Sequence, residues 1–474
     1  MDSPSRERHN ADSTGHTLRC NAHLLQLDLV NEIRSSMAAD KFRFTTVTAV
    51  VVANMVGTGV FTSLGFQLLD IQSGFALLML WAVGGLIAVC GAMTYAELGA
   101  ALPRSGGEYN FLSRIYHPAA GFVSGWISST IGFAGPTALA AMTFAAYMLS
   151  IFPDFAGPWG ERFIAASLVI ALSVVHATNR RNSGGLQLAF TLLKVLIIIA
   201  FVIAAIVLVD TPQPVEFFPQ SGDFGVLTSG EFAVSLIYVS YAFAGWNAAT
   251  YLSSEMENPQ RTLPGILLAG TVIVTLMYVA LNFAFLYAAP MDSMTGEVEV
   301  GYIAAGAAFG TAGGRFTGIV LATLLISTVS AMVMAGPRVI QMIGEDFPLL
   351  SVLGKTNAHG VPAIAIYAQG IITLAFIFSS TFESVLVFSG FTLAINNFAT
   401  VSSIFVLRWR QPNLPRPYKT FLYPLPPLIF LGLTGWTLGF VMLNRPVEAL
   451  FGLAIIASGL FFYWVSLRGS QIEH

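Results

Sequence analysis

Apolar stretches recur along most of the chain and are separated by short polar segments. Twelve of them are about as long as an α-helix must be to cross the hydrocarbon core of a bilayer. They cover residues 44–69, 75–101, 117–150, 163–178, 186–209, 229–253, 264–289, 316–343, 362–380, 384–408, 424–443 and 448–468. The pattern predicts an all-α polytopic membrane protein with about 12 transmembrane helices.

Composition agrees with this class of protein. Of the 474 residues, 55% are hydrophobic and only 10% are charged. No linker divides residues 44–468, so we expect one transmembrane domain between polar tails at 1–43 and 469–474. The tail at 1–43 has no apolar core beside a cleavage site, which argues against a secretory signal. The net charge of −3 and the lack of a basic block indicate no nucleic-acid partner.

Loop charges predict the orientation of the chain. Lys and Arg favour the cytoplasmic side of a membrane. Loops on the side of the N-terminal tail carry Arg104, Arg114, Arg180, Arg181, Arg261, Arg338, Lys355, Arg408, Arg410, Arg416 and Lys419. The opposite loops carry Arg162, Arg315 and Arg445. This asymmetry predicts a multi-pass protein of the plasma membrane with both termini in the cytosol.

Residues that could bind a metal or perform covalent catalysis are sparse. Cys20 lies in the polar tail and Cys90 in an apolar stretch, so neither a disulfide nor a cysteine-ligated metal is expected. The seven histidines form no metal-spaced pair, and there is no Gly-Xaa-Ser-Xaa-Gly motif. We therefore expect no cofactor, no metal and no enzymatic activity. A channel is also disfavoured, because the spans carry no filter signature.

Glycines interrupt two apolar stretches, at Val56 to Val60 and at Phe243 to Asn247. Each interrupted stretch opens a set of five, in residues 44–209 and residues 229–408, while 424–468 forms two peripheral helices. Because five is odd, the second set must be inverted relative to the first. Broken helices persist at membrane depth only where the break is buried or lines a watery cavity. The matched pair therefore predicts a transport site.

The first break offers partners for both ends of a zwitterion. Gly57 and Gly59 permit unusual backbone angles, and Thr58 supplies a hydroxyl. The half-helix that follows begins with free N–H groups, which suit a carboxylate, and carbonyls near Val56 suit an ammonium. The alternative for this Gly-Xaa-Gly pattern is close packing between helices.

The second break adds groups for a substrate side chain. Gly245 supplies backbone freedom, Phe243 and Trp246 supply aromatic area, and Asn247 supplies an amide beside Ala244. Ordinary packing is the alternative for such an aromatic patch. The matched position of the two breaks favours a functional site.

Lys194 is the basic residue well inside an apolar stretch. An ammonium at the bilayer centre costs about 2.5–3.5 kcal/mol on insertion scales, so it should face protein or water. It is either a structural lysine satisfied by carbonyls or a residue that couples transport to a proton. Ser327 and Ser330 continue a hydroxyl line from Thr323 and are candidates for the same coupling role. The alternative is that these hydroxyls bond their own backbone.

Charged residues flank several predicted spans. Glu97, Glu108, Glu255, Arg104 and Arg261 either pair as an inner gate or are solvated loop charges.

Several motifs together resemble the amino acid-polyamine-organocation (APC) superfamily, and in particular its L-type amino acid transporters. The segments that carry the resemblance are Asn54 to Phe61, Tyr95 to Gly99, Pro103 to Tyr109, Tyr241 to Asn247 and Arg408 to Pro426. The resemblance covers nearly all of residues 44–468. It implies an inverted five-plus-five helix repeat of the LeuT-like type, with the two remaining helices peripheral.

The resemblance also implies roles for individual residues. The backbone at Thr58 and Gly59 would hold the substrate carboxylate, and carbonyls near Val56, Phe243 and Ala244 would hold the amino group. Residues that would bound the side-chain pocket are Phe243, Trp246 and Asn247. Lys194 would stand in for a sodium ion or take part in proton coupling. The segment from Ile151 to Arg162 has no Cys, so we expect no disulfide-linked heavy subunit.

These observations predict a secondary active transporter of amino acids that works by alternating access, as a proton symporter or an exchanger. Neutral L-amino acids are favoured, because no Asp or Glu lies near the middle of spans 1, 3, 6 or 8 to balance a cationic side chain. The alternative is a cationic amino acid or polyamine transporter or antiporter of the same superfamily.

Overall fold

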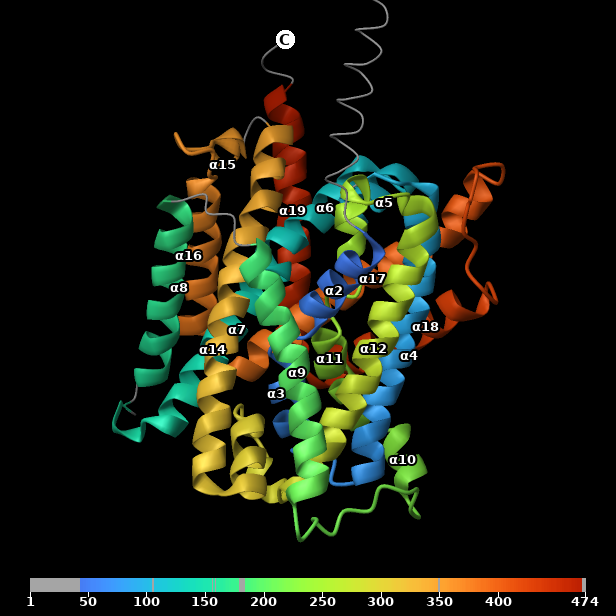
Figure 1. Cartoon of the computed structure of the whole chain (residues 1–474). Helices are drawn as coiled ribbons and strands as arrows, with labels where there is room; N and C mark the ends of the chain where they lie inside the picture. Colours follow the sequence, from blue (N-terminus) through green and yellow to red (C-terminus); the bar gives the residue numbers. More distant parts are fainter. Residues whose placement is uncertain are drawn as a thin grey trace, which may run out of the picture.

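The computed structural model describes residues 43–104, 106–155, 157, 159–178, 184–347 and 350–470. These residues form α-helices with short 3-10 and π segments, and they contain no β-strand (Figure 1). Nine of the described helical segments are long and apolar enough to cross a membrane. Two shorter apolar helices, α9 and α16, and the interrupted segment α11–η3 bring the number to the predicted twelve.

The elements follow the predicted spans closely. In the first half they are α2 (Phe44–Met55) and α3 (Gly59–Gln67), α4 (Gly74–Ala101), α6 (Pro118–Ile127), η1 (Ser128–Gly132) and α7 (Ala134–Ile151), α8 (Gly160–Thr178) and α9 (Gly184–Leu208). In the second half they are α11 (Gly230–Ala242) and η3 (Ala248–Glu255), α12 (Pro259–Ala288), α14 (Val300–Asp346), α16 (Ala363–Ser379) and α17 (Phe382–Arg410). The chain ends with α18 (Leu425–Asn444) and α19 (Pro446–Ser470).

Three features were not predicted from the hydrophobic pattern. The third span is interrupted by a π-helical turn, η1, between α6 and α7. The long helix α14 breaks at Gly310, where φ is 74°, so its first ten residues form a separate arm. A short helix, α5 (Gly107–Ile115), follows α4. Other short elements are η2 (Pro153–Phe155), α10 (Asp223–Leu227), α13 (Met291–Met294) and α15 (Ser351–Gly354).

The two interrupted segments cross each other in opposite directions. Helix α11, the first half of the second interrupted segment, packs against α3, the second half of the first. In return, η3 packs against α2. Figure 1 shows α2, α3 and α11 close together in the interior of the bundle. This antiparallel crossing is the arrangement expected of two elements related by inversion.

Two glycines allow the crossing to be this close. A Cβ at Gly59 would lie 2.6 Å from Ala242 Cα, and a Cβ at Gly245 would lie 2.8 Å from the backbone oxygen of Asn54. Gly245 also has φ of 105°, a conformation that L-residues rarely adopt. Each break therefore presses a glycine against the backbone of the other break.

Tyr278 of α12 joins the two breaks from a third helix. Its hydroxyl lies 2.5 Å from the carbonyl oxygen of Met55 and 3.1 Å from that of Ala242. These carbonyls end the two helices that the breaks interrupt, where backbone acceptors lose their intrahelical partners. One buried phenol thus places its single donor between two acceptors that have no partner in lipid.

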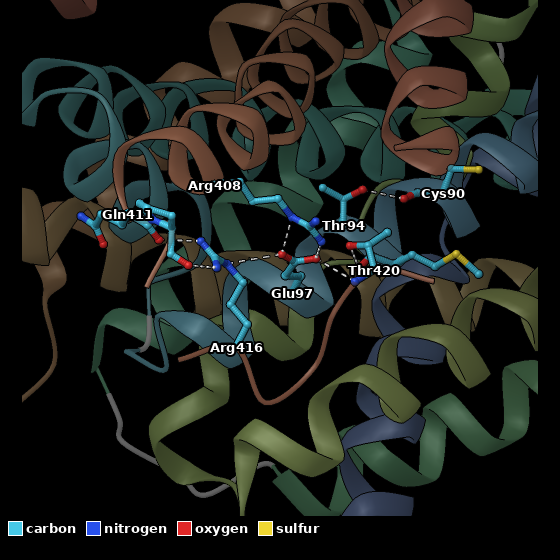
Figure 2. A network of polar contacts seen from close by, with 9 residues as sticks. Cys90, Thr94, Glu97, Arg408, Gln411, Arg416 and Thr420 are labelled. Atoms are coloured by element: carbon cyan, nitrogen blue, oxygen red, sulfur yellow. Dashed lines mark hydrogen bonds and ion pairs between the residues drawn. The ribbon is translucent and has the colours of Figure 1, made fainter. Parts of the chain in front are cut away.

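A buried carboxylate fixes the loop between α17 and α18 to α4. Glu97 is fully buried and receives two hydrogen bonds from Arg408, at 2.9 and 2.7 Å, and one from the backbone N–H of Thr420 at 2.7 Å. Arg416 lies on the other side of the carboxylate, with Nε 3.6 Å from Oε1 (Figure 2). Glu97 is therefore neither a solvated loop charge nor a partner of Arg104 or Arg261.

We expect Gly245→Ala to destabilise the protein by about 1–3 kcal/mol, because it adds backbone strain and a clash with Asn54. The melting temperature in detergent should fall. Gly432→Ala in α18 is the control, since its added methyl group would meet nothing within 4 Å. Equal melting temperatures for the two variants would contradict the close crossing.

Arg408→Met should destabilise the protein by about 3–5 kcal/mol, because it leaves the buried Glu97 without its bidentate partner. Lys419→Met is the matched control: it removes the same charge at an exposed position in the loop that follows α17. The melting temperature should fall for the first variant alone. A similar loss for both variants would argue that the loop charge, and not the buried pair, matters.

Candidate functional site

A cavity of about 170 Å³ lies where the two interrupted segments cross. Its wall includes residues from α2, α3, α11, η1, α7, α14 and α17, with α5 and η3 at one end. Its polar lining includes Thr58, Glu108, Ser128, Asn247, Tyr251 and Thr328. The size is comparable with cavities of about 150 Å³ that hold a benzene molecule, so a small organic molecule fits.

The first break contributes Gly57, Thr58 and Gly59 to this wall. No side chain caps the N-terminus of α3, so the N–H groups of its first turn have no side-chain acceptor there. These groups carry the positive end of the helix dipole. The cavity therefore presents an anion-binding helix end beside Gly57, where a Cβ would meet nothing closer than 3.9 Å.

The second break has two faces. Ala244, Gly245 and Asn247 line the cavity. Phe243 and Trp246 do not, because their positions in the turn direct them toward α4. The Phe243 ring packs on Trp81 and Tyr278, with centroids 6.4 and 5.0 Å apart, and Trp246 packs on Tyr95 and Phe430. In this structure the two aromatic side chains pack behind the break and do not line the cavity, whereas Asn247 does.

The apolar wall of the cavity comes from other elements. Phe133 and Pro136 begin α7 after the π turn, and Met332 and Leu393 face them from α14 and α17. Gly132, the last residue of the π turn, lines the cavity beside Phe133. The sequence did not predict Met332 or Leu393, because nothing in a single apolar helix shows which face meets a cavity.

Lys194 lies beside the first break but outside this cavity. Its side chain is buried, and its Nζ donates a hydrogen bond to Oγ1 of Thr328 at 2.7 Å. Val56, Gly57 and Thr328 join Lys194 around a second cavity of about 10 Å³, close to the smallest that holds a water molecule. Gly57 and Thr328 line both cavities, so Lys194 is one side chain away from the larger one.

The structure gives Lys194 a different partner from the predicted hydroxyls. Ser327 is buried, and its Oγ has no hydrogen bond in the described part of the chain. Ser330 bonds Nε2 of His176 at 2.8 Å. Thr328 lies on a neighbouring face of α14 from the line formed by Thr323, Ser327 and Ser330. The sequence gives no signal of this contact, because it is made across the interface between two helices.

Glu108 is a further cavity residue that the sequence did not identify. It lies in α5, is buried, and lines the cavity. The side chains of Tyr251 and Asn247 donate short hydrogen bonds to its carboxylate, and the Tyr95 hydroxyl lies 3.1 Å away. Asn397 of α17 completes this cluster, 3.0 Å from the same hydroxyl. The polar sequence around Glu108 suggested a solvated loop, and that alternative is wrong.

A membrane bundle with two broken helices crossing at a central polar and apolar cavity has the architecture of a solute carrier. A family model described as "Amino acid permease" matches residues 42–467. The chain therefore belongs to the amino acid permease family of the APC superfamily. It is a multi-pass membrane transporter of amino acids and not an enzyme.

Curated relatives are similar over most of the chain. The human protein named "Large neutral amino acids transporter small subunit 2" is 29% identical over 430 residues, which are 88% of this chain and 78% of that protein. Two mouse proteins are similar over 88% of this chain. They are "b(0,+)-type amino acid transporter 1", 25% identical over 85% of its length, and "Asc-type amino acid transporter 1", 26% identical over 80%.

The two faces of the second break predict different effects of substitution. Ala244→Val should raise the half-saturation concentration for transport about tenfold, because overpacking costs about 1–3 kcal/mol and Ala244 lines the cavity. Trp246→Phe should lower the melting temperature and leave the half-saturation concentration within about twofold. Both values can be measured by uptake into proteoliposomes and thermal unfolding in detergent. The reverse pattern would place Trp246, and not Ala244, in the pocket.

Proposed function

We propose that this permease is a secondary active transporter of neutral L-amino acids that works by alternating access, as a proton symporter or an exchanger. The observation that carries the proposal is the convergence of both breaks on one cavity. An uncapped helix end supplies N–H donors there, and the opposed break supplies backbone carbonyls. A free amino acid requires both kinds of partner.

The proposed substrate contacts use the backbone. The N–H groups at Thr58 and Gly59 would bind the carboxylate at the start of α3. The amino group would donate to carbonyls near Val56, Phe243 and Ala244. In support of this assignment, Ala244 lines the cavity, and Val56 and Phe243 each adjoin a residue that does, Gly57 and Ala244 respectively.

A neutral side chain suits the apolar wall formed by Phe133, Pro136, Met332 and Leu393. The name of the human relative, which refers to large neutral amino acids, supports the same class. The sequence argument for neutral substrates assumed that no acidic residue lines the pocket, and Glu108 corrects that assumption. Its carboxylate already receives hydrogen bonds from Asn247 and Tyr251, so it does not require a cation from the substrate. Cationic amino acids or polyamines are the second candidate class, favoured by the charge of Glu108.

Lys194 is the proposed coupling residue. Thr328 holds its ammonium next to the first break, and Gly57 and Thr328 separate it from the substrate cavity. Movement of a proton on or off Lys194 would change the charge beside the segment that binds the substrate. Ser327 and Ser330 remain weaker candidates for this role, since neither bonds Lys194 in this structure.

The membrane location, orientation and subunit composition of the carrier can also be inferred. We infer a plasma-membrane location with both termini in the cytosol, from the excess of Lys and Arg in the loops on one side of the chain. We also infer that the transporter acts without a disulfide-linked heavy subunit. The segment 151–162 has no Cys, and Cys90 is buried within α4.

A counterflow panel in proteoliposomes tests the proposed function. Vesicles are loaded with one amino acid at a time, and exchange is measured against the complete set of amino acids and against polyamines, with and without a pH gradient. Saturable exchange of neutral amino acids is expected. Exchange restricted to cationic compounds would favour the second class, and no exchange of any amino acid would overturn the proposal.

Lys194→Met should reduce proton-driven accumulation at least about tenfold while exchange without a gradient continues, because the variant keeps the length of the side chain and removes its charge. Lys355→Met is the control, since Lys355 is exposed on a loop. Accumulation is measured with an imposed pH gradient. If the wild type does not respond to the gradient, the same variant should change the rate of exchange. A variant that matches the wild type in both assays would refute the coupling role.

A further inference from the structure

The charged side chain in the lining of the cavity is an acidic one, Glu108. Among the residues that line it there is no Lys, Arg or His, and Glu108 is the acidic one. The ion pairs of the described residues involve Glu97, Glu383 and Glu448. Glu108 is thus a buried carboxylate that faces the cavity without a cationic partner in the described part of the chain.

Its neighbours present hydrogen-bond donors to the carboxylate. The Tyr251 hydroxyl and the Asn247 amide both donate to it, one to each carboxylate oxygen. The Tyr95 hydroxyl contacts Glu108 and Asn397 and has one proton for these two acceptors, so the other two donors matter most. Hydrogen bonds donated to a carboxylate favour its charged form and compensate for burial.

The same contact fixes the direction of the Asn247 amide. Asn247 donates one Nδ2–H to Glu108, which fixes the position of its carbonyl oxygen Oδ1. The described side chains give Oδ1 no hydrogen bond, and Asn247 lines the cavity. An amide held in this way presents an acceptor at Oδ1 that cannot exchange places with the amide nitrogen, while its second N–H is still a donor.

We infer that Glu108 determines which side chains the carrier accepts. It excludes amino acids with an acidic side chain, and through Asn247 it favours side chains that carry a hydrogen-bond donor, such as a hydroxyl, an amide or an ammonium. This inference rests on the proposed amino acid transport and assigns a selectivity subsite within the same cavity. Glu108 repels acidic side chains through its own charge. It affects hydrogen bonding indirectly, because it positions the Asn247 amide.

The expected size of the effect follows from electrostatics and hydrogen bonding. A second carboxylate within about 10 Å of Glu108, at the effective dielectric constant of a protein interior, is disfavoured about tenfold or more. A side-chain donor that pairs with Asn247 Oδ1 gains about fivefold over an isosteric side chain without it.

Isosteric pairs of amino acids test both effects. In the counterflow assay, competition by glutamine is compared with competition by glutamate, and threonine is compared with valine. The wild type should prefer glutamine about tenfold or more and threonine about fivefold. Glu108→Gln should bring both ratios to within about threefold, because the amide removes the charge and can itself donate to Asn247, which frees that residue to turn.

Two further variants separate selectivity from damage to the fold. Glu108→Asp keeps the charge and should retain the preference for glutamine over glutamate. Tyr251→Phe removes one donor to Glu108 but keeps the carboxylate, and it should retain the same preference. Loss of that preference in Tyr251→Phe as well as in Glu108→Gln would show that the packing of the cluster, and not its charge, is responsible.

Failure of this inference is distinguishable from failure of the proposed function. Exchange of amino acids by the wild type, with equal competition by glutamine and glutamate, would overturn the role of Glu108 and leave transport intact. This comparison needs no variant, so it decides the question even if Glu108→Gln does not fold. The absence of any exchange would instead overturn the proposed transport.

Discussion

The structure depends on a close contact between two segments of broken helix. Backbone groups released by a break have no partner in lipid, so both breaks must find their partners within the protein. Local turns supply part of them, since the Gly57 N–H donates to the Met55 carbonyl and the Ala244 N–H to the Tyr241 carbonyl. The breaks also cross closely, with Gly59 against Ala242 and Gly245 against Asn54, and the Tyr278 hydroxyl lies between the carbonyls at both helix ends. Because the crossing leaves an uncapped helix end and backbone carbonyls beside one cavity, the proposed substrate site is a product of the same constraint that makes the breaks tolerable.

In each part of the site, some residues line the cavity and others pack behind them. In the second break, Ala244 and Asn247 face the cavity while Phe243 and Trp246 anchor the turn on α4. The same division applies to α14, where Thr328 lines the cavity and also holds Lys194. A substitution in the residues that pack behind the cavity lining would therefore affect a bound substrate through one intervening residue.

The sequence alone predicted the features that depend on residues close together in the chain. Apolar length predicted the spans, and glycine within an apolar run predicted both breaks, so Thr58, Ala244 and Asn247 could be named in advance. Contacts between distant segments could not be predicted. Thr328 bonds Lys194 across 134 residues, and Tyr95 meets Asn397 across 302, which depends on the rotation of packed helices. Glu108 was missed because α5 is short and polar and follows a turn, a pattern that is typical of a solvated loop.

The pair formed by Glu97 and Arg408 has a consequence for how the protein is made. The two residues are 311 positions apart. At about 5–20 residues per second, a ribosome needs roughly 15–60 s to travel between them. During that interval α4 carries a carboxylate destined for a fully buried position, and the arginine that neutralises it has not yet been synthesised. Until α17 has been synthesised, α4 must therefore lie near the membrane surface or bind a temporary partner. The helix bundle can therefore close around Glu97 only in the last part of translation.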